Sequence, residues 1–172
     1  MTVLGIDIGG SAVKYAPVRN GEITPPVSRV ATPQSKAALL ECVSDIITSA
    51  QRTWNVTAVG IGVAGFIRRR DGVIVRSPNL LFLNGTAFAS EITRRDPLPV
   101  MVDNDANCAG LGAWLDQPTP RPRCLVHLTL GTGVGSVIIL DGRPWHGACG
   151  YAAELGHMVV HPEGRACGCG GR

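Results

Sequence analysis

One stretch of the chain places a carboxylate where it could act as a general base. Residues 100–107, Val-Met-Val-Asp-Asn-Asp-Ala-Asn, have the pattern of an apolar strand that ends in polar side chains, and helix-forming residues follow at 106–114. Asn104 and Asp105 therefore fall at the carboxyl end of a strand and the amino end of a helix, where open α/β sheets bind ligands. We expect Asp105 to accept a proton from a substrate.

Two structural roles compete with catalysis at Asp105. Asp and Asn are preferred helix caps because their side-chain oxygens accept unpaired N–H groups of the first helical turn, so a capping role stays open. A calcium loop is excluded. After Asp103, Asp105 and Asn107 such a loop needs Gly next and Glu at its twelfth position, and the sequence has Cys108 and Trp114 there.

Two glycine-rich turns could bind phosphate. Residues 130–136, Leu-Gly-Thr-Gly-Val-Gly-Ser, expose successive backbone N–H groups with little side-chain obstruction, and such groups bind phosphate oxygens. An earlier turn follows Asp7 at residues 9–11. Neither contains the Gly-Lys-Ser/Thr of a Walker loop, so a metal ion and the backbone must balance the phosphate charge. Asp7 is placed to hold Mg²⁺, directly or through water, although a turn-stabilising role is the alternative.

The two turns belong to a repeated pattern. Aligning Gly10 with Gly131 also aligns Asn20-Gly21 with Asp141-Gly142, so each copy has a strand, a glycine-rich turn, a second strand and a two-residue turn. A duplicated hairpin predicts two related domains that face one ligand. Chance similarity between two glycine-rich turns is the alternative.

His157, Cys167 and Cys169 have a spacing that suits metal binding. They could supply three ligands of a tetrahedral zinc site, and a closed site needs a fourth. Cys149 could be that ligand in principle, but its spacing does not argue for it. The six cysteines are expected to be reduced thiols or metal ligands because no secretion signal is present. We expect His161 to be a surface residue.

A further glycine-rich run, residues 60–65 (Gly-Ile-Gly-Val-Ala-Gly), formally matches the dinucleotide-binding fingerprint. Its glycines lie inside an apolar run rather than after it, no helical pattern follows, and no acidic residue stands about 20 positions on to bind a ribose. We interpret these glycines instead as positions where the backbone can approach a ligand closely.

Hydrophobic periodicity predicts the elements that position these residues. We expect three meandering strands at 3–8, 12–18 and 23–30, an amphipathic helix at 35–54, strands at 56–63 and 73–75, and a short helix at 86–95. The proline-rich residues 117–123 are the best linker candidate, and a new strand begins at Cys124. The chain is therefore predicted to be an α/β protein with one domain at 1–117 and the beginning of a second at 118–172.

Composition and charge restrict the class of protein. With 172 residues, 45% of them hydrophobic, the chain can bury one sizeable core, or one domain plus part of another. No leader or long apolar segment is present, which favours a cytoplasmic protein with no membrane partner. The net charge of +3 is spread thinly. Its one cluster, residues 68–70, precedes Asp71-Gly72, so we interpret it as a solvated turn and expect no nucleic-acid partner.

Together these motifs resemble the ROK family of sugar kinases, repressors and open reading frames, within the actin-like ATPase superfamily. Residues 7–11 look like its first phosphate motif, 130–136 like its second, and 103–107 like its catalytic segment. Residues 154–157 followed by 167–170 match its sugar and zinc segment. The resemblance implies an actin-like ATPase, ribonuclease H-like fold with a complete N-terminal domain and the start of the second.

The resemblance also implies roles for individual residues. Asp105 would be the base that activates a sugar hydroxyl, commonly O6, toward ATP. Sugar binding would fall to Gly65, Asn79, Asn104, Glu154 and His157. Binding of ATP and Mg²⁺ would fall to Asp7, Gly9, Gly10, Ser11, Lys14, Gly131, Thr132 and Gly133. The Zn²⁺ ligands would be His157, Cys167 and Cys169. Members of the family often form dimers or tetramers, so a homo-oligomer is compatible with the resemblance.

The sequence departs from the family pattern at its end. The family motif continues from Cys-x-Cys-Gly to Gly-Cys-x-Glu, which supplies the fourth zinc ligand and another sugar contact, whereas this sequence stops at Arg172. The adenosine-binding half of the second domain is missing as well. We therefore expect a fragment or truncated gene model, which as a 172-residue molecule binds ATP and zinc poorly.

The leading functional hypothesis is ATP-dependent phosphorylation of a hexose, glucokinase-like, by the complete parent protein. A sugar-responsive transcriptional repressor of the same family is the main alternative, disfavoured because the first phosphate motif starts at residue 5 and leaves no room for a preceding winged helix. A polyphosphate-using glucokinase is disfavoured by the cysteine segment. An inactive fragment that only binds sugar is the third alternative.

Overall fold

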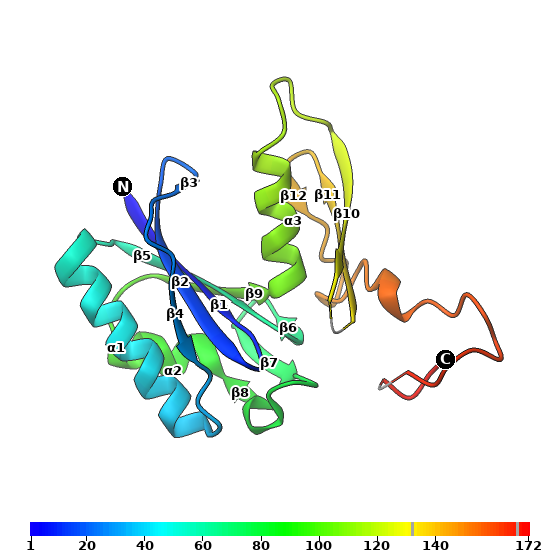
Figure 1. Ribbon diagram of the computed structural model, residues 1–172, viewed down its shortest axis with the longest axis horizontal. Coiled ribbons are helices and arrows are strands. Elements are labelled where there is room, and N and C mark those ends of the chain that lie inside the picture. The colour runs from blue at the N-terminus through cyan, green and yellow to red at the C-terminus, as the bar shows by residue number, and fades with distance from the viewer. Residues whose placement is uncertain (132, 168) are drawn as a thin grey trace. The chain divides into compact units, whose positions relative to one another are not determined.

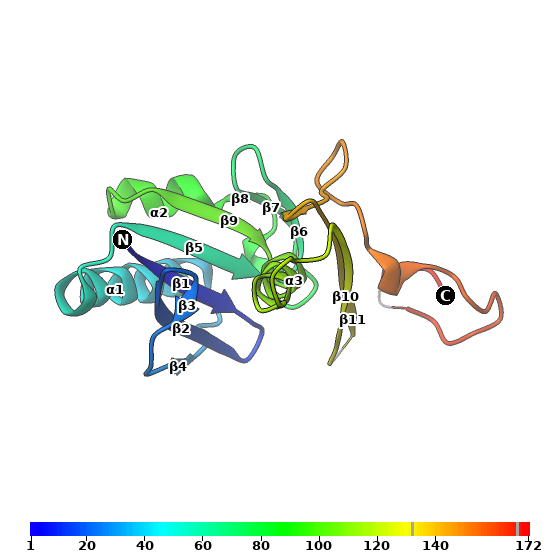
Figure 2. The same ribbon diagram turned by 90° about the horizontal axis from the view of Figure 1, so that it is seen from above.

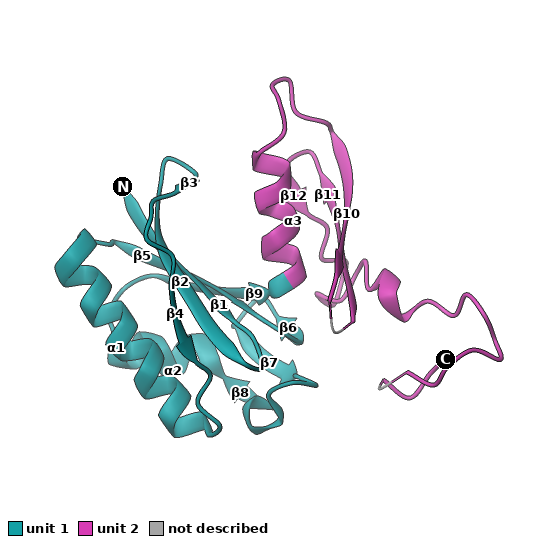
Figure 3. Cartoon of the chain, viewed as in Figure 1, with its two compact units in different colours: residues 1–105 teal, residues 106–172 magenta. Residues whose placement is uncertain are grey.

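The computed structural model describes residues 1–131, 133–167 and 169–172. They form two compact units, residues 1–105 and 106–172 (Figure 3). The helix α3, Asp105–Leu115, belongs to the second unit from its second residue on. Its Gly110 lies so close to Val137 that an added Cβ atom would be 2.0 Å from the valine Cγ1 atom. The proline-rich residues 117–123 have no helix or strand, and the domain boundary at 117 and 118 stays a prediction.

The first unit is built on a six-stranded sheet in the order β3-β2-β1-β5-β9, with β4 also paired to β2 (Figure 1). Strands β1, β5 and β9 are parallel to one another, and β2 is antiparallel to β1. The bounds are β1 Thr2–Ile8, β2 Ala12–Arg19, β3 Glu22–Ile23, β4 Ser28–Ala31, β5 Ala58–Val63 and β9 Val100–Asn104.

The strand predicted at 23–30 is two short strands. Residues 25 and 26 are both proline, which has no backbone N–H group to donate to a sheet, so pairing stops after Ile23 and resumes at Ser28. Both β3 and β4 pair with β2.

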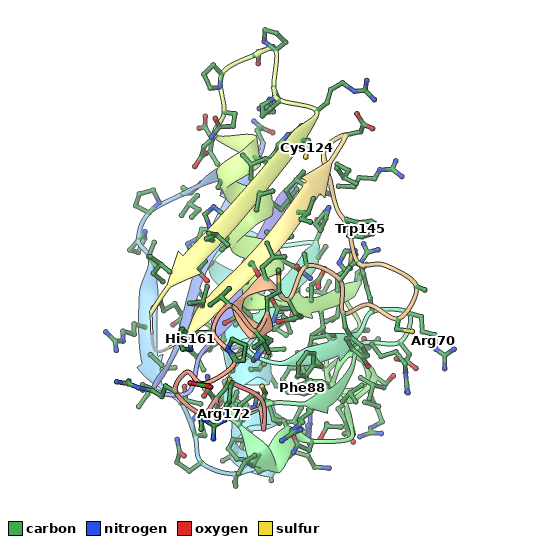
Figure 4. All side chains as sticks on the ribbon, turned by 90° about the vertical axis from the view of Figure 1, so that its right-hand side faces the viewer. Arg70, Phe88, Cys124, Trp145, His161 and Arg172 are labelled. Carbon is green, nitrogen blue, oxygen red and sulfur yellow. The ribbon has the colours of Figure 1, made fainter. Side chains whose placement is uncertain are left out.

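Two helices provide the apolar layer of the first unit, α1 (Lys36–Trp54) and α2 (Phe88–Arg95), which pack against each other (Figure 2). The Oγ atom of Ser35 caps α1 by accepting the Ala38 N–H group at 3.3 Å. The buried residues of α1 recur at helical spacing and face the apolar side chains of the sheet, as predicted. Phe88, at the start of α2, is fully buried (Figure 4).

A second, three-stranded sheet follows β5 in the chain. Its strands are β6 (Phe66–Arg68), β7 (Val73–Arg76) and β8 (Thr86–Ala87), and the short 3-10 helix η1, Leu81–Leu83, lies between β7 and β8. The first two residues of the helix predicted at 86–95 are thus a strand. Because β5 runs into a turn and then β6, and not into a helix, the glycines at 60–65 do not form a dinucleotide-binding turn, as interpreted from the sequence.

The arginine cluster lies at the turn between β6 and β7. The Nε atom of Arg68 donates to both carboxylate oxygens of Asp71, at 3.0 and 2.9 Å. The hydrogen bond from Arg68 is the main reason that the pKa of Asp71 lies below its usual value. Arg70 is exposed (Figure 4). The cluster is therefore a solvated turn, as interpreted.

The second unit repeats the first hairpin. Its strands are β10 (Cys124–Leu130), β11 (Val134–Leu140) and β12 (Arg143–Pro144), all antiparallel, and η2, Leu155–His157, is a short 3-10 helix. The pairing of β11 with β12, Leu140 to Arg143, matches that of β2 with β3, Arg19 to Glu22, at the alignment predicted from the sequence. Both two-residue turns have left-handed backbones, with φ of 53° and 85° in one and 47° and 80° in the other.

One face of β10 is apolar and exposed. Burial alternates along the strand, and Val126, Leu128 and Leu130 are 54%, 53% and 82% exposed. In the described part of the chain, β10 is also an edge strand of its sheet. No helix among the described residues is long and apolar enough to cross a membrane.

Candidate functional site

The predicted site residues of the first unit gather where its parallel strands end. Ile8 pairs with Val63, and Val63 pairs with Asn104, so β1, β5 and β9 finish at the same edge of the sheet. The glycine-rich turn, Gly65 and Asn104 all follow or complete these strands. Open α/β sheets bind ligands at such an edge. Asn104 lies at the carboxyl end of its strand, as predicted from the sequence.

Asn104 is held at both its backbone and its side chain. Its Nδ2 atom donates to the Gly65 carbonyl at 3.0 Å, and its backbone N–H donates to the Asp103 Oδ1 atom at 2.8 Å. The Nε atom of Arg69 lies 3.7 Å from the other carboxylate oxygen of Asp103. Asp105 comes next and is the first residue of α3. That position is compatible with both roles expected from the sequence, a helix cap and a general base.

Gly65 occupies a position that other residues fit poorly. Its φ is +138°, and a Cβ atom added there would lie 2.4 Å from the Arg76 carbonyl oxygen and 2.9 Å from the Ser77 Cα atom. Other backbone atoms therefore lie close to Gly65. The interpretation that these glycines let the backbone approach a ligand stays a prediction. The carbonyl of the same residue accepts the hydrogen bond that orients the Asn104 side chain.

Ser77 is a buried residue that the sequence did not reveal. It is fully buried, its hydroxyl donates to the Ala64 carbonyl at 2.6 Å, and it accepts the Leu80 N–H group at 3.2 Å. These two bonds fix the residues beside Gly65 and Asn79, two predicted sugar ligands. A Cβ atom added to Gly10 would lie 3.4 Å from the Asn79 Cβ atom. The first glycine turn therefore lies beside Asn79.

We predict that Gly65→Ala destabilises the protein by about 3 kcal/mol, because the substitution combines a strained backbone with overlap against backbone atoms. Urea denaturation measures the change in the free energy of unfolding. Gly60→Ala is the matched control, since a Cβ atom at Gly60 would meet nothing within 4 Å. It should be neutral or stabilise by up to about 1 kcal/mol. Equal effects of the two substitutions would contradict the close approach at Gly65.

The first glycine turn is fixed by Thr32, which sequence reasoning also missed. The Thr32 hydroxyl donates to the Gly9 carbonyl at 2.7 Å, and its backbone N–H donates to the Ser11 carbonyl at 3.2 Å. Asp7 faces Lys14 across the β1–β2 pair, with its Oδ2 atom 3.4 Å from the lysine Nζ atom. Both side chains are about half exposed, so this pair contributes little to stability.

The second glycine turn connects β10 to β11. The Gly131 N–H group donates to the Gly133 carbonyl at 3.0 Å. Thr132, predicted with them to bind ATP, lies outside the described residues. The structure thus describes the two flanking glycines of this predicted phosphate site.

The predicted zinc ligands come together in the second unit. His157, Cys167 and Cys169 each offer one ligand atom, a ring nitrogen or a sulfur, and these three atoms lie within 4.8 Å of one another. The Cys167 Sγ atom lies 3.8 Å from the His157 Nδ1 atom. Hydrogen bonds from the Gly171 backbone, then from Cys167 and His157, lower the pKa of Cys169 from 9.0 to about 7. Cys149 is not in this cluster. His161 is exposed, as predicted (Figure 4).

Glu154 lies beside the same cluster. Its Oε2 atom is 3.9 Å from the Nε2 atom of His157, the ring nitrogen other than the one near Cys167. The two ring nitrogens of His157 therefore have different neighbours, a thiol and a carboxylate. The His157 ring could therefore bind a metal ion through Nδ1, on the side of Cys167, and a polar group such as the Glu154 carboxylate through Nε2.

Solved structures similar to this chain include sugar kinases. A ROK family glucokinase from Streptomyces griseus, solved with glucose and AMPPNP, is 32% identical, with a TM-score of 0.88 over 100% of this chain and 55% of that chain. The protein accordingly has the actin-like ATPase fold of the sugar kinases, as predicted. The chain belongs to the ROK family, whose model matches residues 3–172.

Curated relatives include both kinases and a regulator. Glucokinase from Streptomyces coelicolor is 32% identical over 97% of this chain and 52% of the relative. A xylose repressor from Caldicellulosiruptor bescii is 32% identical over 80% of this chain and 35% of the repressor. The chain spans about half the length of the glucokinase relatives it matches.

Proposed function

We propose that the complete protein transfers the γ-phosphoryl group of ATP to a hexose hydroxyl, as a glucokinase does, with Asp105 as the general base. The observation that carries this proposal is the position of Asn104 and Asp105 at the carboxyl end of β9, with the Asn104 amide bonded to the Gly65 carbonyl. A glucokinase of similar structure was solved with glucose and AMPPNP, which supports a sugar and a nucleotide as the ligands.

In this reaction the Asp105 carboxylate takes the proton of the sugar hydroxyl. The hydroxyl oxygen forms a bond to the γ-phosphorus, the bond from that phosphorus to the β–γ bridging oxygen breaks, and ADP leaves with the electron pair. Asn79, Asn104 and the Gly65 backbone hold the other hydroxyls in place. By the family resemblance, Glu154 and His157 share that role. These hydroxyls occur in several hexoses and N-acetylhexosamines.

The glycine turns are proposed to bind the phosphates of ATP. The N–H groups of Gly9 and Gly131 are donated to the Ala12 and Gly133 carbonyls and shape the two turns. The N–H groups of Gly10, Ser11 and Gly133 would contact phosphate oxygens, and Lys14 adds one positive charge. Asp7 has the half-exposed carboxylate that a hydrated Mg²⁺ ion requires. The ion would neutralise charge that builds up on the phosphates. The Lys14 Nζ atom lies 3.4 Å from the Asp7 Oδ2 atom. In the complex with ATP, the Asp7 carboxylate would face Mg²⁺ and the Lys14 ammonium group would face a phosphate.

His157, Cys167 and Cys169 are proposed to hold a structural Zn²⁺ ion. Two thiols and an imidazole are typical zinc ligands, and their donor atoms lie within 4.8 Å of one another, close enough for one ion. His157 would bind through Nδ1, which lies near Cys167, and keep Nε2 for Glu154 and the sugar. The ion would thereby tie the sugar segment to the Cys-x-Cys turn.

A sugar-responsive regulator is the second candidate, favoured by the similarity to the xylose repressor. The test is a coupled assay of the complete gene product with ATP, Mg²⁺ and either glucose or N-acetylglucosamine. Sugar-dependent release of ADP supports the kinase. Binding of glucose by calorimetry without any release of ADP would support the regulator instead. Sedimentation of the same sample reports whether the protein is a homo-oligomer, as we propose from the family.

A further inference from the structure

Ser136, on β11, forms a closed set of hydrogen bonds with the segment that carries Glu154. Its hydroxyl donates to the Ala153 carbonyl at 2.6 Å and accepts the Leu155 N–H group at 2.8 Å. The same N–H group also donates to the Ala153 carbonyl at 2.8 Å. Ser136 is only 5% exposed, so water competes little for these bonds. One side chain thus satisfies the backbone groups on both sides of Glu154.

The segment needs this support because its backbone is unusual. Ala153 has a φ of 66°, in the left-handed region that residues with a Cβ atom rarely adopt. Glu154 has φ of −74° and ψ of 57°, the centre of an inverse γ-turn closed by the Leu155 N–H group. A three-residue turn with one internal hydrogen bond does not hold a single conformation by itself.

A second contact fixes the far side of the turn. Gly156 packs so closely on β11 that an added Cβ atom would lie 2.1 Å from the Val134 carbonyl oxygen. Val134 and Ser136 are the first and third residues of β11, directly after the second glycine turn. The same few residues of the strand therefore follow the proposed phosphate turn and support Glu154.

We propose that Ser136 is a positioning residue for sugar binding, which acts by fixing the Glu154 backbone and so the direction of the Glu154 carboxylate. This inference rests on the proposed role of Glu154 in holding a sugar hydroxyl. Ser136 itself contacts only backbone atoms in these bonds, so it acts through Glu154.

The test uses Ser136→Ala in the complete protein, with glucose as the sugar. Loss of the hydroxyl leaves a buried carbonyl and amide short of one partner, and the turn relaxes. We expect the KM for glucose to rise about tenfold, the size of change that follows from one buried hydrogen bond, with the KM for ATP almost unchanged. Amide hydrogen exchange at Leu155, measured without sugar, should become faster. Ser136→Thr, which keeps the hydroxyl, should restore slow exchange and most of the glucose affinity.

Ser44→Ala is the matched control. Its hydroxyl donates to the Asp96 Oδ2 atom at 2.7 Å in the first unit, so the substitution also removes one partly buried hydrogen bond. Suppose that Ser136→Ala and Ser44→Ala lose similar thermal stability, and that each variant changes the KM for glucose as much as the KM for ATP. Ser136 would then have a general structural role, and the inference would be overturned. Unchanged Leu155 exchange in Ser136→Ala would overturn it as well.

Glu154→Gln separates the two proposals. If this variant binds glucose as tightly as the natural protein, the sugar-binding role of Glu154 is wrong, whatever Ser136 does. If Glu154→Gln raises the KM for glucose and Ser136→Ala does not, only the positioning role fails. If both proposals hold, the double variant should lose less affinity than the sum of the single losses, because both substitutions act on the same contact.

Discussion

Asp105→Ala in the complete protein is expected to lower kcat for hexose phosphorylation by about 10²- to 10⁴-fold, the usual contribution of a positioned general base. The KM for the sugar should change little, because the carboxylate acts on the proton that moves in the transition state. A coupled assay of ADP release with glucose measures both constants. Turnover close to that of the natural protein would show that Asp105 is not the base.

The isosteric variant Asp105→Asn distinguishes a base from a helix cap. Asparagine keeps a side-chain oxygen that can cap α3, but it cannot accept the proton. If Asp105 is the base, the asparagine variant loses as much kcat as the alanine variant and retains more stability. If Asp105 is only a cap, the asparagine variant resembles the natural protein in both respects, and only the alanine variant loses stability, by about 1 kcal/mol.

Replacing Cys169 with serine should abolish a zinc site in the complete protein. We expect the natural protein to contain about one tightly bound zinc ion per chain and Cys169→Ser to contain almost none, because a closed site needs all four of its ligands. Elemental analysis after dialysis measures the ratio. Cys124→Ser is the control, since Cys124 is exposed on β10 and lies outside the ligand cluster. Absence of zinc from the complete protein would contradict the assignment.

The zinc affinity should also depend on pH in a stated direction. The pKa of Cys169 is lowered from 9.0 to about 7, so in the metal-free protein roughly half of this thiol is thiolate at pH 7. Zinc binds the thiolate, and protons compete for it below that pH. Affinity should therefore fall as pH drops from 7 to 5. Alkylation of metal-free Cys169 by iodoacetamide should rise between pH 6 and 8 and be blocked by zinc. A labelling midpoint near 9 would contradict the lowered pKa.

Local patterns predicted most of the elements because each depends on neighbouring residues. The helix that follows Ser35 shows clear periodicity, and the strand that ends at Asn104 is an apolar run closed by polar residues. The repeat from Gly10 to Gly131 correctly predicted the two-residue turn at Asp141-Gly142. The split at residues 25 and 26 could have been foreseen from the missing N–H donors. The short strands β6 and β8 could not, since their pairing depends on β7 and not on their own sequences.

The supporting serines show why the rest of the site was not predictable. Ser77 bonds to the Ala64 carbonyl, 13 residues away, and Ser136 bonds to the Ala153 carbonyl, 17 residues away. A serine inside or beside an apolar run has no local signal that distinguishes it from a solvent-facing residue. Only the fold brings its hydroxyl to a backbone turn. By contrast, spacing alone predicted that His157 and Cys167 would lie together, because metal ligands restrict residue type as well as position. A metal ion at that cluster stays a prediction.

The edge strand β10 has a practical consequence for anyone who prepares a polypeptide of these 172 residues. Unpaired backbone groups run along its edge, and Val126, Leu128 and Leu130 are exposed on one face of the same strand. Strands of that kind add to one another between molecules and build up insoluble assemblies. Concentrated samples of such a polypeptide should therefore precipitate through intermolecular strand pairing, and a lysine in place of Leu128 should keep them in solution.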